Sequence, residues 1–487
     1  MFGGPLAGQF EGRVLVLGGG SVSQCSVPLL LEHIVKRPNQ LTVMDYQDMR
    51  PKFADAIAQG ANFVTGKVEK DNLSSLLSEH LSSGDVLIDL AWNIDANTII
   101  GWCHDNDVLY LNTSVEEWDP YESQSDRDPR ERTLIVRHQK MDEMKKSWKE
   151  TGPTAVVEHG ANPGMVSHFV KRALTELAAE CLAKNVFDAD READIRNALV
   201  DREYNRLAYL LEVKVIHISE RDTQVTDQPK RPGEFVNTWS VAGFHEEGIA
   251  PAELGWGTHE KKLPAKGLRH ETSETQICIA APGATTWVRS WVPDYEINGM
   301  VVRHGEAYTI TKHLTVKDES GKEIYRPTVH YAYCPSDAAI ASMRELQANN
   351  WEFPTKERIM NDEIIDGEDR LGVLLMGHPL NAWWTGSLLS IHEARKLAPH
   401  QSATTLQVGS SVLACTKWMI ENPNRGLCVP DDLPWDEVLE TAYPYLGPIH
   451  SGPVDWTPLK NRVDLFGKWD GEAKSSDPWQ FENFLIS

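Results

Sequence analysis

The chain has 487 residues, of which 41% are hydrophobic and 24% are charged, with a mean hydropathy of -0.39. This length predicts more than one domain, and the composition excludes a disordered chain. The net charge of -23 at pH 7 repels phosphate backbones, so we expect no nucleic-acid partner. The acidic excess either keeps the protein soluble or attracts a cationic small molecule.

No apolar run approaches the roughly 20 residues needed to cross a bilayer, and the first residues lack a signal-peptide pattern. We therefore expect neither export nor membrane insertion. The seven cysteines are scattered without CxxC or CxH spacing, which predicts reduced thiols in a cytoplasmic protein and argues against a bound metal.

The first part of the chain alternates between short apolar runs and helical patterns. We expect strands at 13–17, 41–44, 62–65, 86–90, 109–111 and 155–158, and helices at 22–36, 53–59, 71–81 and 96–106. This alternation predicts an α/β domain of the Rossmann type, a doubly wound parallel sheet with helices on both faces.

The stretch LGGGSVS joins the first strand to the first helix. Gly18, Gly20 and Ser23 match the G-x-G-x-x-(small) spacing, in which backbone amides at a helix N-terminus receive a pyrophosphate. Serine in the third position is larger than the usual glycine, so it loosens the match slightly. The context of strand, turn, helix and second strand favours a dinucleotide site over a plain glycine-rich loop.

Asp45 ends the second strand. A carboxylate there accepts hydrogen bonds from a ribose and repels a 2′-phosphate, which favours NAD over NADP; the alternative is a surface carboxylate in a turn. Ligands of parallel sheets collect at the carboxyl ends of the strands. The predicted cofactor contacts are Gly18, Gly20, Ser21, Val22, Ser23, Asp45, Ala91, Trp92, Thr113, Asn162 and Pro163.

The second half of the chain has a different residue pattern from the first. A charged segment at 188–211 is helical and exposed in character, and short alternating runs with many Gly, Pro and Trp follow. These runs lie at 213–220, 234–244, 276–282, 286–292, 301–310 and 313–318, with a later strand at 372–378 and a helix at 405–421. They predict an α+β domain with a mostly antiparallel sheet.

Several longer stretches resemble bacterial homospermidine synthases, a family in the broad saccharopine dehydrogenase-like group. They are VEHGANPGMVSHFVK (157–171), HISERDTQ (217–224), FVNTWSVAGF (235–244), EEGIAPAELGWGT (246–258), IYRPTVHYAY (324–333) and DGEDRLGVLLMGH (366–378). The resemblance runs from the glycine loop almost to the C-terminal DPWQFENFL, so it covers nearly the whole chain.

The resemblance implies an NAD-dependent aminobutyl transfer, in which two putrescines give homospermidine and ammonia. The hydride taken from the first diamine is later returned, so NAD acts as a tightly held catalyst. The resemblance also implies a Rossmann domain at residues 1–152 and a substrate domain at 153–487, whose last segment packs back on the first domain. The family pairs into homodimers.

The resemblance further implies which residues act on a diamine. Glu220 and Glu247 are the implied pocket acids, Glu116 lies near the nicotinamide, and Trp239 offers an aromatic face to a positive carbon. The remaining implied site residues are Asn162, which orients the amine, and His304, Asp369, Asn93 and Asp95. Which carboxylate accepts the proton depends on burial, so sequence leaves it open.

Each assignment has a plainer structural alternative. A strand tryptophan usually belongs to a core, Asn162 before a proline is typical of a turn, and a histidine beside an arginine is typically a hydrogen-bonding residue. Relatives carry an acidic residue after the fourth strand, where this chain has Asn93 and, two places on, Asp95. The contact to the distal ammonium group is therefore assigned to either residue.

Two other functions remain open at this point. One is a reductive condensation of the carboxynorspermidine or saccharopine dehydrogenase type, which needs a pocket Arg or Lys for a substrate carboxylate. The other is a dinucleotide-sensing protein without catalysis, in which the glycine loop and Asp45 persist but the pocket acids have no role.

Overall fold

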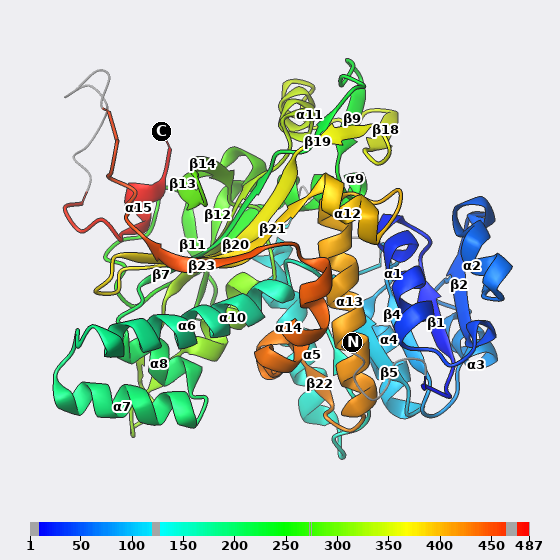
Figure 1. Cartoon of the computed structure of the whole chain (residues 1–487), viewed down its shortest axis with the longest axis horizontal. Coiled ribbons are helices and arrows are strands. Elements are labelled where there is room, and N and C mark those ends of the chain that lie inside the picture. The colour runs from blue at the N-terminus through cyan, green and yellow to red at the C-terminus, as the bar shows by residue number, and fades with distance from the viewer. Residues whose placement is uncertain (1–8, 119–126, 272, 274, 464–474, 487) are drawn as a thin grey trace.

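The computed structural model describes residues 9–118, 127–271, 273, 275–463 and 475–486. Within them, a seven-stranded parallel sheet has the order β22-β6-β5-β4-β1-β2-β3 (Figure 1). Its strands are β1 (Val14–Leu17), β2 (Leu41–Asp45), β3 (Asn62–Thr65), β4 (Val86–Asp89), β5 (Leu109–Asn112), β6 (Ala155–Val156) and β22 (Leu427–Cys428). Without β22 this is the strand order of the dinucleotide-binding fold, which confirms the predicted Rossmann domain.

The strands of this sheet read as continuous aliphatic runs because both faces are covered. In β1, Val14 and Val16 belong to one hydrophobic core, whereas Leu15 and Leu17 belong to the core on the opposite face. The helices of this region are α1 (Ser21–His33), α2 (Ala54–Gln59), α3 (Leu73–His80), α4 (Ala96–Asp105) and α5 (Leu134–Ser147).

The C-terminal part of the chain returns to the first sheet. Helix α13 (Ala403–Glu421) lies against α1 and stands between α1 and the second sheet (Figure 1). A Cβ atom on Gly409 would lie 2.9 Å from Sγ of Cys25, so the glycine permits this close packing. Strand β22 then pairs with β6. The domain boundary between residues 152 and 153 stays a prediction.

The second sheet has ten strands within the described residues. Its main path is β11-β12-β10-β17-β7-β20-β21-β23, and the hairpin of β13 and β14 joins at β17. The strands are β7 (Val215–Asp222), β10 (Pro251–Gly255), β11 (Gly267–Arg269), β12 (Gln276–Pro282), β13 (Trp287–Val292), β14 (Tyr295–Met300), β17 (Thr328–Cys334), β20 (Glu368–Met376), β21 (Ala382–Ser390) and β23 (Ile449–Val454). Only the central pair, β7 and β17, is parallel, so the predicted mostly antiparallel sheet is confirmed.

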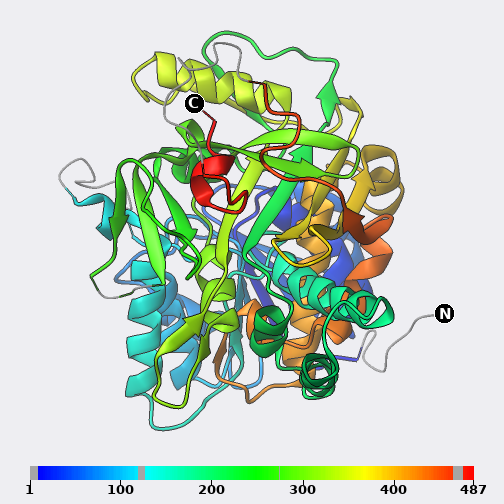
Figure 2. The ribbon, with the colours of Figure 1, turned by 90° about the vertical axis from the view of Figure 1, so that its left-hand side faces the viewer.

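Helices and short strands surround the second sheet. They are α6 (Met165–Ala183), α7 (Ala189–Val200), α8 (Tyr204–Leu210), α9 (Val241–Ile249), α10 (Glu306–Leu314), α11 (Asp337–Ala348), α12 (Ile391–Leu397), α14 (Trp435–Ala442), α15 (Phe481–Phe484), β8 (Val225–Thr226), β9 (Glu234–Asn237), β15 (Val316–Lys317), β16 (Glu323–Tyr325), β18 (Lys356–Ile359) and β19 (Ile364–Asp366). Figure 2 shows α11 at the top of the molecule and α15, in red, in front of the sheet. None of the described helices is long and apolar enough to cross a membrane.

Three predicted segments differ from the structure. Residues 234–244 form a strand and then the start of α9, because the Ser240 hydroxyl accepts a hydrogen bond from the Gly243 amide and caps the helix. Residues 301–310 form a loop and the start of α10, where the apolar spacing is helical and not alternating. Residues 188–211 form two helices with buried faces, where an exposed helical segment was expected.

Candidate active site

The glycine loop forms the turn that the sequence predicts. Gly18 has a φ of +88°, and a Cβ atom there would lie 2.6 Å from the carbonyl oxygen of Leu90, so only glycine fits. A Cβ on Gly20 would meet no atom within 4 Å, which leaves its backbone open to a ligand. Ser23 is buried, and its hydroxyl donates a hydrogen bond to the carbonyl of Gly18. The serine therefore braces the turn rather than loosening it.

A cavity of about 840 Å³ opens above this loop. Its wall includes the predicted cofactor contacts Gly18, Gly20, Ser21, Val22, Ser23, Asp45, Ala91 and Trp92. Thr113, Asn162 and Pro163 are not among its lining residues. Ser240 and Ile359, which belong to the second half of the chain, close the cavity, so it lies where the two halves of the chain meet.

Asp45 is held rigidly at the end of β2. Its Oδ2 accepts a hydrogen bond from the Gly19 amide at 2.6 Å, and its Oδ1 accepts one from the Gln47 amide at 2.7 Å. The carboxylate thus lies beside the open Gly20 backbone on one cavity wall. A free helix N-terminus, an open glycine and an acid at the end of the second strand together fit a dinucleotide.

Glu220 lies on the buried face of β7. Its Oε2 accepts a hydrogen bond from the Asn162 amide nitrogen at 2.7 Å and another from the Tyr331 hydroxyl. Burial raises the pKa of Glu220 to about 7, against the opposing effect of these two hydrogen bonds. A carboxyl group with such a pKa exchanges protons readily near neutral pH.

Two more buried carboxyl groups share this face of the sheet. In the strand register Asp222 pairs with Asp369, and Glu220 is next but one to Asp222 along β7. Burial first, then the charges of Glu220 and Asp222, raise the pKa of Asp369 well above its usual range, and its Oδ2 accepts a hydrogen bond from the Thr404 hydroxyl. We name Glu220, Asp222 and Asp369 the acid cluster. Its members hold protons in common, because three buried carboxylates cannot all ionise.

Trp239 connects the acid cluster to the cofactor cavity. It is half-buried, and its indole N–H donates a hydrogen bond to the Tyr333 hydroxyl at 2.9 Å. The neighbouring residue, Ser240, lines the cavity. The indole is thus linked to Tyr333 on β17, and the residue that follows it in the chain lies in the cavity wall.

His304 lies between two carboxylates. Its Nε2 is 3.0 Å from Glu247 Oε2, and its Nδ1 is 3.1 Å from Glu306 Oε1. Burial lowers the pKa of His304, but the two carboxylates outweigh it and hold the pKa well above its usual value. Its ring lies 4.4 Å from that of Tyr331, which joins this charged group to Glu220.

Glu116 lies in a separate buried network. Burial and the charge of Glu246 raise the pKa of Glu116 to about 7, and the Ser114 hydroxyl donates to it at 2.8 Å. Glu246 itself is paired with Arg137 at 3.0 Å and with Arg303. Glu246 is therefore bound by two arginines, whereas the next residue on α9, Glu247, faces His304.

The two candidates for the distal ammonium contact lie in different places. Asn93 lines the cofactor cavity, and its side-chain oxygen is buried with no partner among the described residues. Asp95 caps α4, where its Oδ1 accepts hydrogen bonds from the amide and the hydroxyl of Thr98 at 2.8 and 2.7 Å. The structure thus brings Asn93, and not Asp95, to the cavity.

The sequence patterns do not identify Asp222, Glu306, Tyr331 and Tyr333 as site residues. The signal was present in part, because alternate residues of SERD and YAY point to one face of a strand. The pairing of β7 with β17 and β20 was missing, and only that register places the tyrosines beside Glu220.

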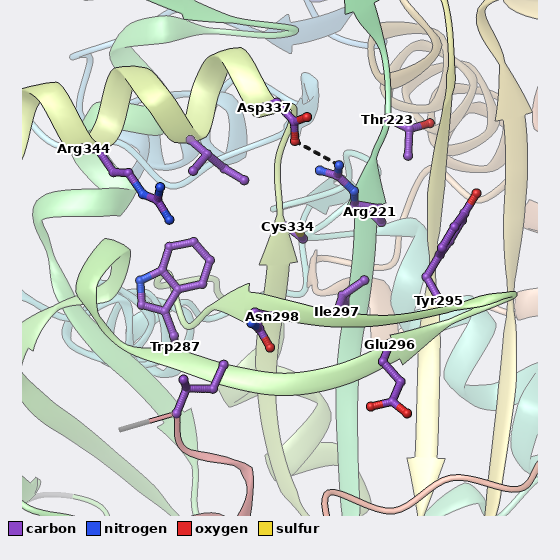
Figure 3. Close-up of a pocket in the computed structure, with 12 residues that line it drawn as sticks. Arg221, Thr223, Trp287, Tyr295, Glu296, Ile297, Asn298, Cys334, Asp337 and Arg344 are labelled. Carbon is purple, nitrogen blue, oxygen red and sulfur yellow. Dashed lines mark hydrogen bonds and ion pairs between the residues drawn. The ribbon is translucent and has the colours of Figure 1, made fainter. Parts of the chain in front are cut away.

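A second cavity, of about 600 Å³, lies on the other face of β7 and β17 (Figure 3). Arg221 and Arg344 point into it, and Arg221 donates a hydrogen bond to Asp337 at 3.0 Å. It contains none of the predicted site residues. The two guanidinium groups are matched by the carboxylates of Glu296 and Asp337, so the cavity lacks the acidic excess that a diammonium ion favours.

Comparison with known proteins agrees with this arrangement. The family described as "Saccharopine dehydrogenase NADP binding domain" matches residues 14–156, and "Saccharopine dehydrogenase C-terminal domain" matches residues 160–452. The homospermidine synthase of Blastochloris viridis is 41% identical over 488 residues, which are 99% of each chain. That of Mesorhizobium japonicum is also 41% identical, over 99% of this chain and 98% of the relative.

A solved structure extends the likeness to three dimensions. The crystal structure of the homospermidine synthase from Legionella pneumophila in complex with NAD has a TM-score of 0.86 and 38% identity, covering 98% of each chain. Sequence and fold agree over almost the whole length. The chain therefore belongs to the homospermidine synthase family, within the saccharopine dehydrogenase-like group.

Proposed function

We propose that this protein is an NAD-dependent homospermidine synthase, which transfers an aminobutyl group from one putrescine to another with release of ammonia. The observation that carries the proposal is the position of Trp239. Its indole is hydrogen-bonded towards the acid cluster, while the next residue lines the cofactor cavity. A diamine held there reaches both a hydride carrier and a proton acceptor.

NAD, when bound, supplies the acceptor and later the donor of a hydride. Its support in this chain is the open Gly20 backbone and the Asp45 carboxylate, and a relative's crystal structure contains NAD. The negative charge of Asp45 opposes a 2′-phosphate, so we expect NAD to bind in preference to NADP.

Glu220 is the proton acceptor in this proposal. It takes a proton from one ammonium group of the diamine, and the free amine then permits hydride loss from the adjacent carbon. Among the acids left open by the sequence, Glu220 has a pKa of about 7 and contacts the Asn162 amide, which orients the amine. Glu116 has a similar pKa but lies beside Arg137 and Arg303, which repel an ammonium group.

The positive carbon formed by hydride loss lies against the Trp239 face. The amine of a second diamine attacks this carbon, ammonia leaves, and the returned hydride completes homospermidine. The Glu247 carboxylate and the side-chain oxygen of Asn93 hold the ammonium groups that remain charged. Asp369, whose pKa is raised well above its usual range, offers its Oδ1 as a neutral acceptor.

A putrescine-only incubation with sub-stoichiometric NAD tests the function. Formation of a triamine in excess over NAD, with no lasting NADH absorbance, supports the synthase. A requirement for an amino acid and an aldehyde supports a reductive condensation enzyme instead. A protein that binds NAD but forms no product is the dinucleotide-sensing alternative.

Replacement of Trp239 tests its role. Because the π face stabilises a cation by roughly 0.5 to 2 kcal/mol, Trp239→Phe should keep part of the activity and Trp239→Ala little of it. Rates of triamine formation measure both variants. Equal activities contradict a role for the aromatic face.

We also propose a homodimer located in the cytoplasm. The described cysteines are all free, which suits a reducing compartment. Light scattering on the purified protein gives the assembly mass, and a monomer mass contradicts the dimer.

A further inference from the structure

Strand β17 holds two tyrosines that face the proposed site. Tyr331 and Tyr333 are two residues apart, so their side chains leave the same face of the strand. Their rings are stacked, with centroids 5.0 Å apart and planes inclined by 13°. Both are buried, with 3% and 1% of their surfaces exposed. The pair is therefore one rigid aromatic unit.

Each tyrosine hydroxyl contacts a different residue of the proposed reaction. The Tyr331 hydroxyl donates to Oε2 of Glu220, and the Tyr333 hydroxyl accepts the indole N–H of Trp239. Phe244 packs edge-on against Tyr333 at 5.6 Å and lies against Trp239 at 6.0 Å with the ring planes inclined by 51°, which limits rotation of the indole. The spacing of the two tyrosines along β17 therefore sets the positions of Glu220 and of the Trp239 indole relative to each other.

We propose that Tyr331 and Tyr333 are positioning residues, which fix the Glu220 carboxylate and the Trp239 indole plane at a set separation. The inference rests on the proposed function, because it concerns the same site. Proton removal and stabilisation of the positive carbon occur at neighbouring atoms of one diamine. A fixed separation of the two groups therefore lowers the cost of bringing both into place.

The two hydroxyls predict different kinetic effects. The hydrogen bond from Tyr331 lowers the pKa of Glu220, so Tyr331→Phe should raise that pKa and move the acid limb of the kcat/KM profile to higher pH. Among the described residues the only hydrogen bond of the Tyr333 hydroxyl is that from Trp239. Tyr333→Phe should therefore leave the acid limb in place and lower kcat about tenfold, with KM for putrescine nearly unchanged.

Tyr325→Phe is the matched control. Tyr325 is also buried, and its hydroxyl donates to the backbone carbonyl of Val213 at 2.7 Å, away from the proposed site. It reports the general effect of losing one buried tyrosine hydroxyl. We expect this variant to lose stability without a change in kcat or in the pH profile.

The experiment is a steady-state analysis of triamine formation by the full-length protein with saturating NAD. Wild type, the three tyrosine variants, Trp239→Phe and Trp239→Phe/Tyr333→Phe are compared across pH 5.5 to about 9, with melting temperatures and NAD affinities measured alongside. If Tyr333 acts through the indole, its replacement costs little once Trp239 is phenylalanine.

The outcomes separate the inference from the function. If Tyr333→Phe resembles Tyr325→Phe, or costs as much in the Trp239→Phe background, the role of Tyr333 is overturned. If the acid limb of the kcat/KM profile does not move in Tyr331→Phe, the role of Tyr331 is overturned. This measurement tests the inference by itself if Tyr333→Phe does not fold. A wild-type protein that forms no triamine overturns the proposed function itself, and the inference with it.

Discussion

The cofactor cavity and the acid cluster are built in different ways. The cavity is built on the glycine turn that begins at Gly18, and residues 44–46, 66–71, 90–94, 118, 240 and 359 complete its wall. The acid cluster is formed by side chains from β7 and β20, and its partners come from β17 and the Asn162 loop. A local motif therefore identifies the first, whereas only tertiary structure assembles the second.

This difference predicts separable losses on mutation. Changes near the glycine loop should alter NAD affinity, and changes in the acid cluster should alter turnover with NAD affinity preserved. Each variant below tests whether the two regions are as independent as their construction indicates.

The largest effect is expected for Glu220→Gln. Loss of the proton acceptor should lower kcat for triamine formation about 10²- to 10⁴-fold while NAD still binds. In wild type kcat/KM should rise with pH through about 7, because Glu220, whose pKa is raised, accepts a proton only when ionised. Steady-state kinetics across pH and calorimetric NAD titration measure both quantities.

Glu260→Gln is the control for that variant. Burial also raises the pKa of Glu260 to about 7, but its hydrogen bonds go to Thr328 and the Phe481 amide, outside the acid cluster. It should leave kcat and the acid limb unchanged. An acid limb that persists near pH 7 in an active Glu220→Gln protein contradicts the assignment.

Gly18→Ala should damage the other region. The added Cβ would lie 2.6 Å from a backbone carbonyl at a φ of +88°, so the turn must shift. Strain of this kind costs about 1 to 3 kcal/mol, which corresponds to a loss of NAD affinity of about fivefold to 150-fold. Gly84→Ala is matched, because Gly84 also has a positive φ (+83°) but open space around it. It should reduce stability and spare NAD binding.

Gly243→Ala tests the junction of the two regions. A Cβ on Gly243 would lie 2.9 Å from the ring of Trp239, so the indole must shift, and the shift disturbs its hydrogen bond to Tyr333. We expect kcat to fall about tenfold while NAD affinity stays within about twofold. Gly248→Ala, on the same helix, would meet the flexible end of Met343 and, at an ordinary contact distance of 3.4 Å, the Cβ atom of Ala284, so it should keep full turnover. Equal losses in the two variants point to a general defect of α9.

The sequence predicts the cofactor cavity better than the acid cluster, because the glycine loop is a local motif and the cluster depends on strand pairing. The alternation of strands and helices, the glycine turn and Asp45 follow from short-range spacing, and the structure confirms the fold that they predict. The loop and helix at 301–314 and the capped start of α9 were misassigned, because short apolar runs fit either a strand or a helix.

Residue spacing alone did not predict the acid cluster. Glu220 and Trp239 came from the family resemblance, and their partners on β17 depend on a pairing between strands more than 100 residues apart in sequence, as the 111-residue separation of Tyr331 and Glu220 shows. Periodicity gives the face of each strand but not its neighbour, so the tyrosine pair was found only in the folded chain.

Asp45→Ser should give the smallest effect and the finest comparison. The carboxylate accepts the Gly19 and Gln47 amides, so it shapes the loop as well as facing the cavity. A serine keeps one acceptor and removes the charge, so NAD affinity should fall about fivefold and NADP should bind more tightly than to wild type. Asp48→Ser is the control, because Asp48 lies in the same turn but is exposed and paired with Arg50. If both variants change the ratio of NAD affinity to NADP affinity equally, surface charge sets cofactor choice and the Asp45 contact does not. Cofactor choice would then depend on more of the molecule than the loop motif, which contradicts the contrast between the two regions.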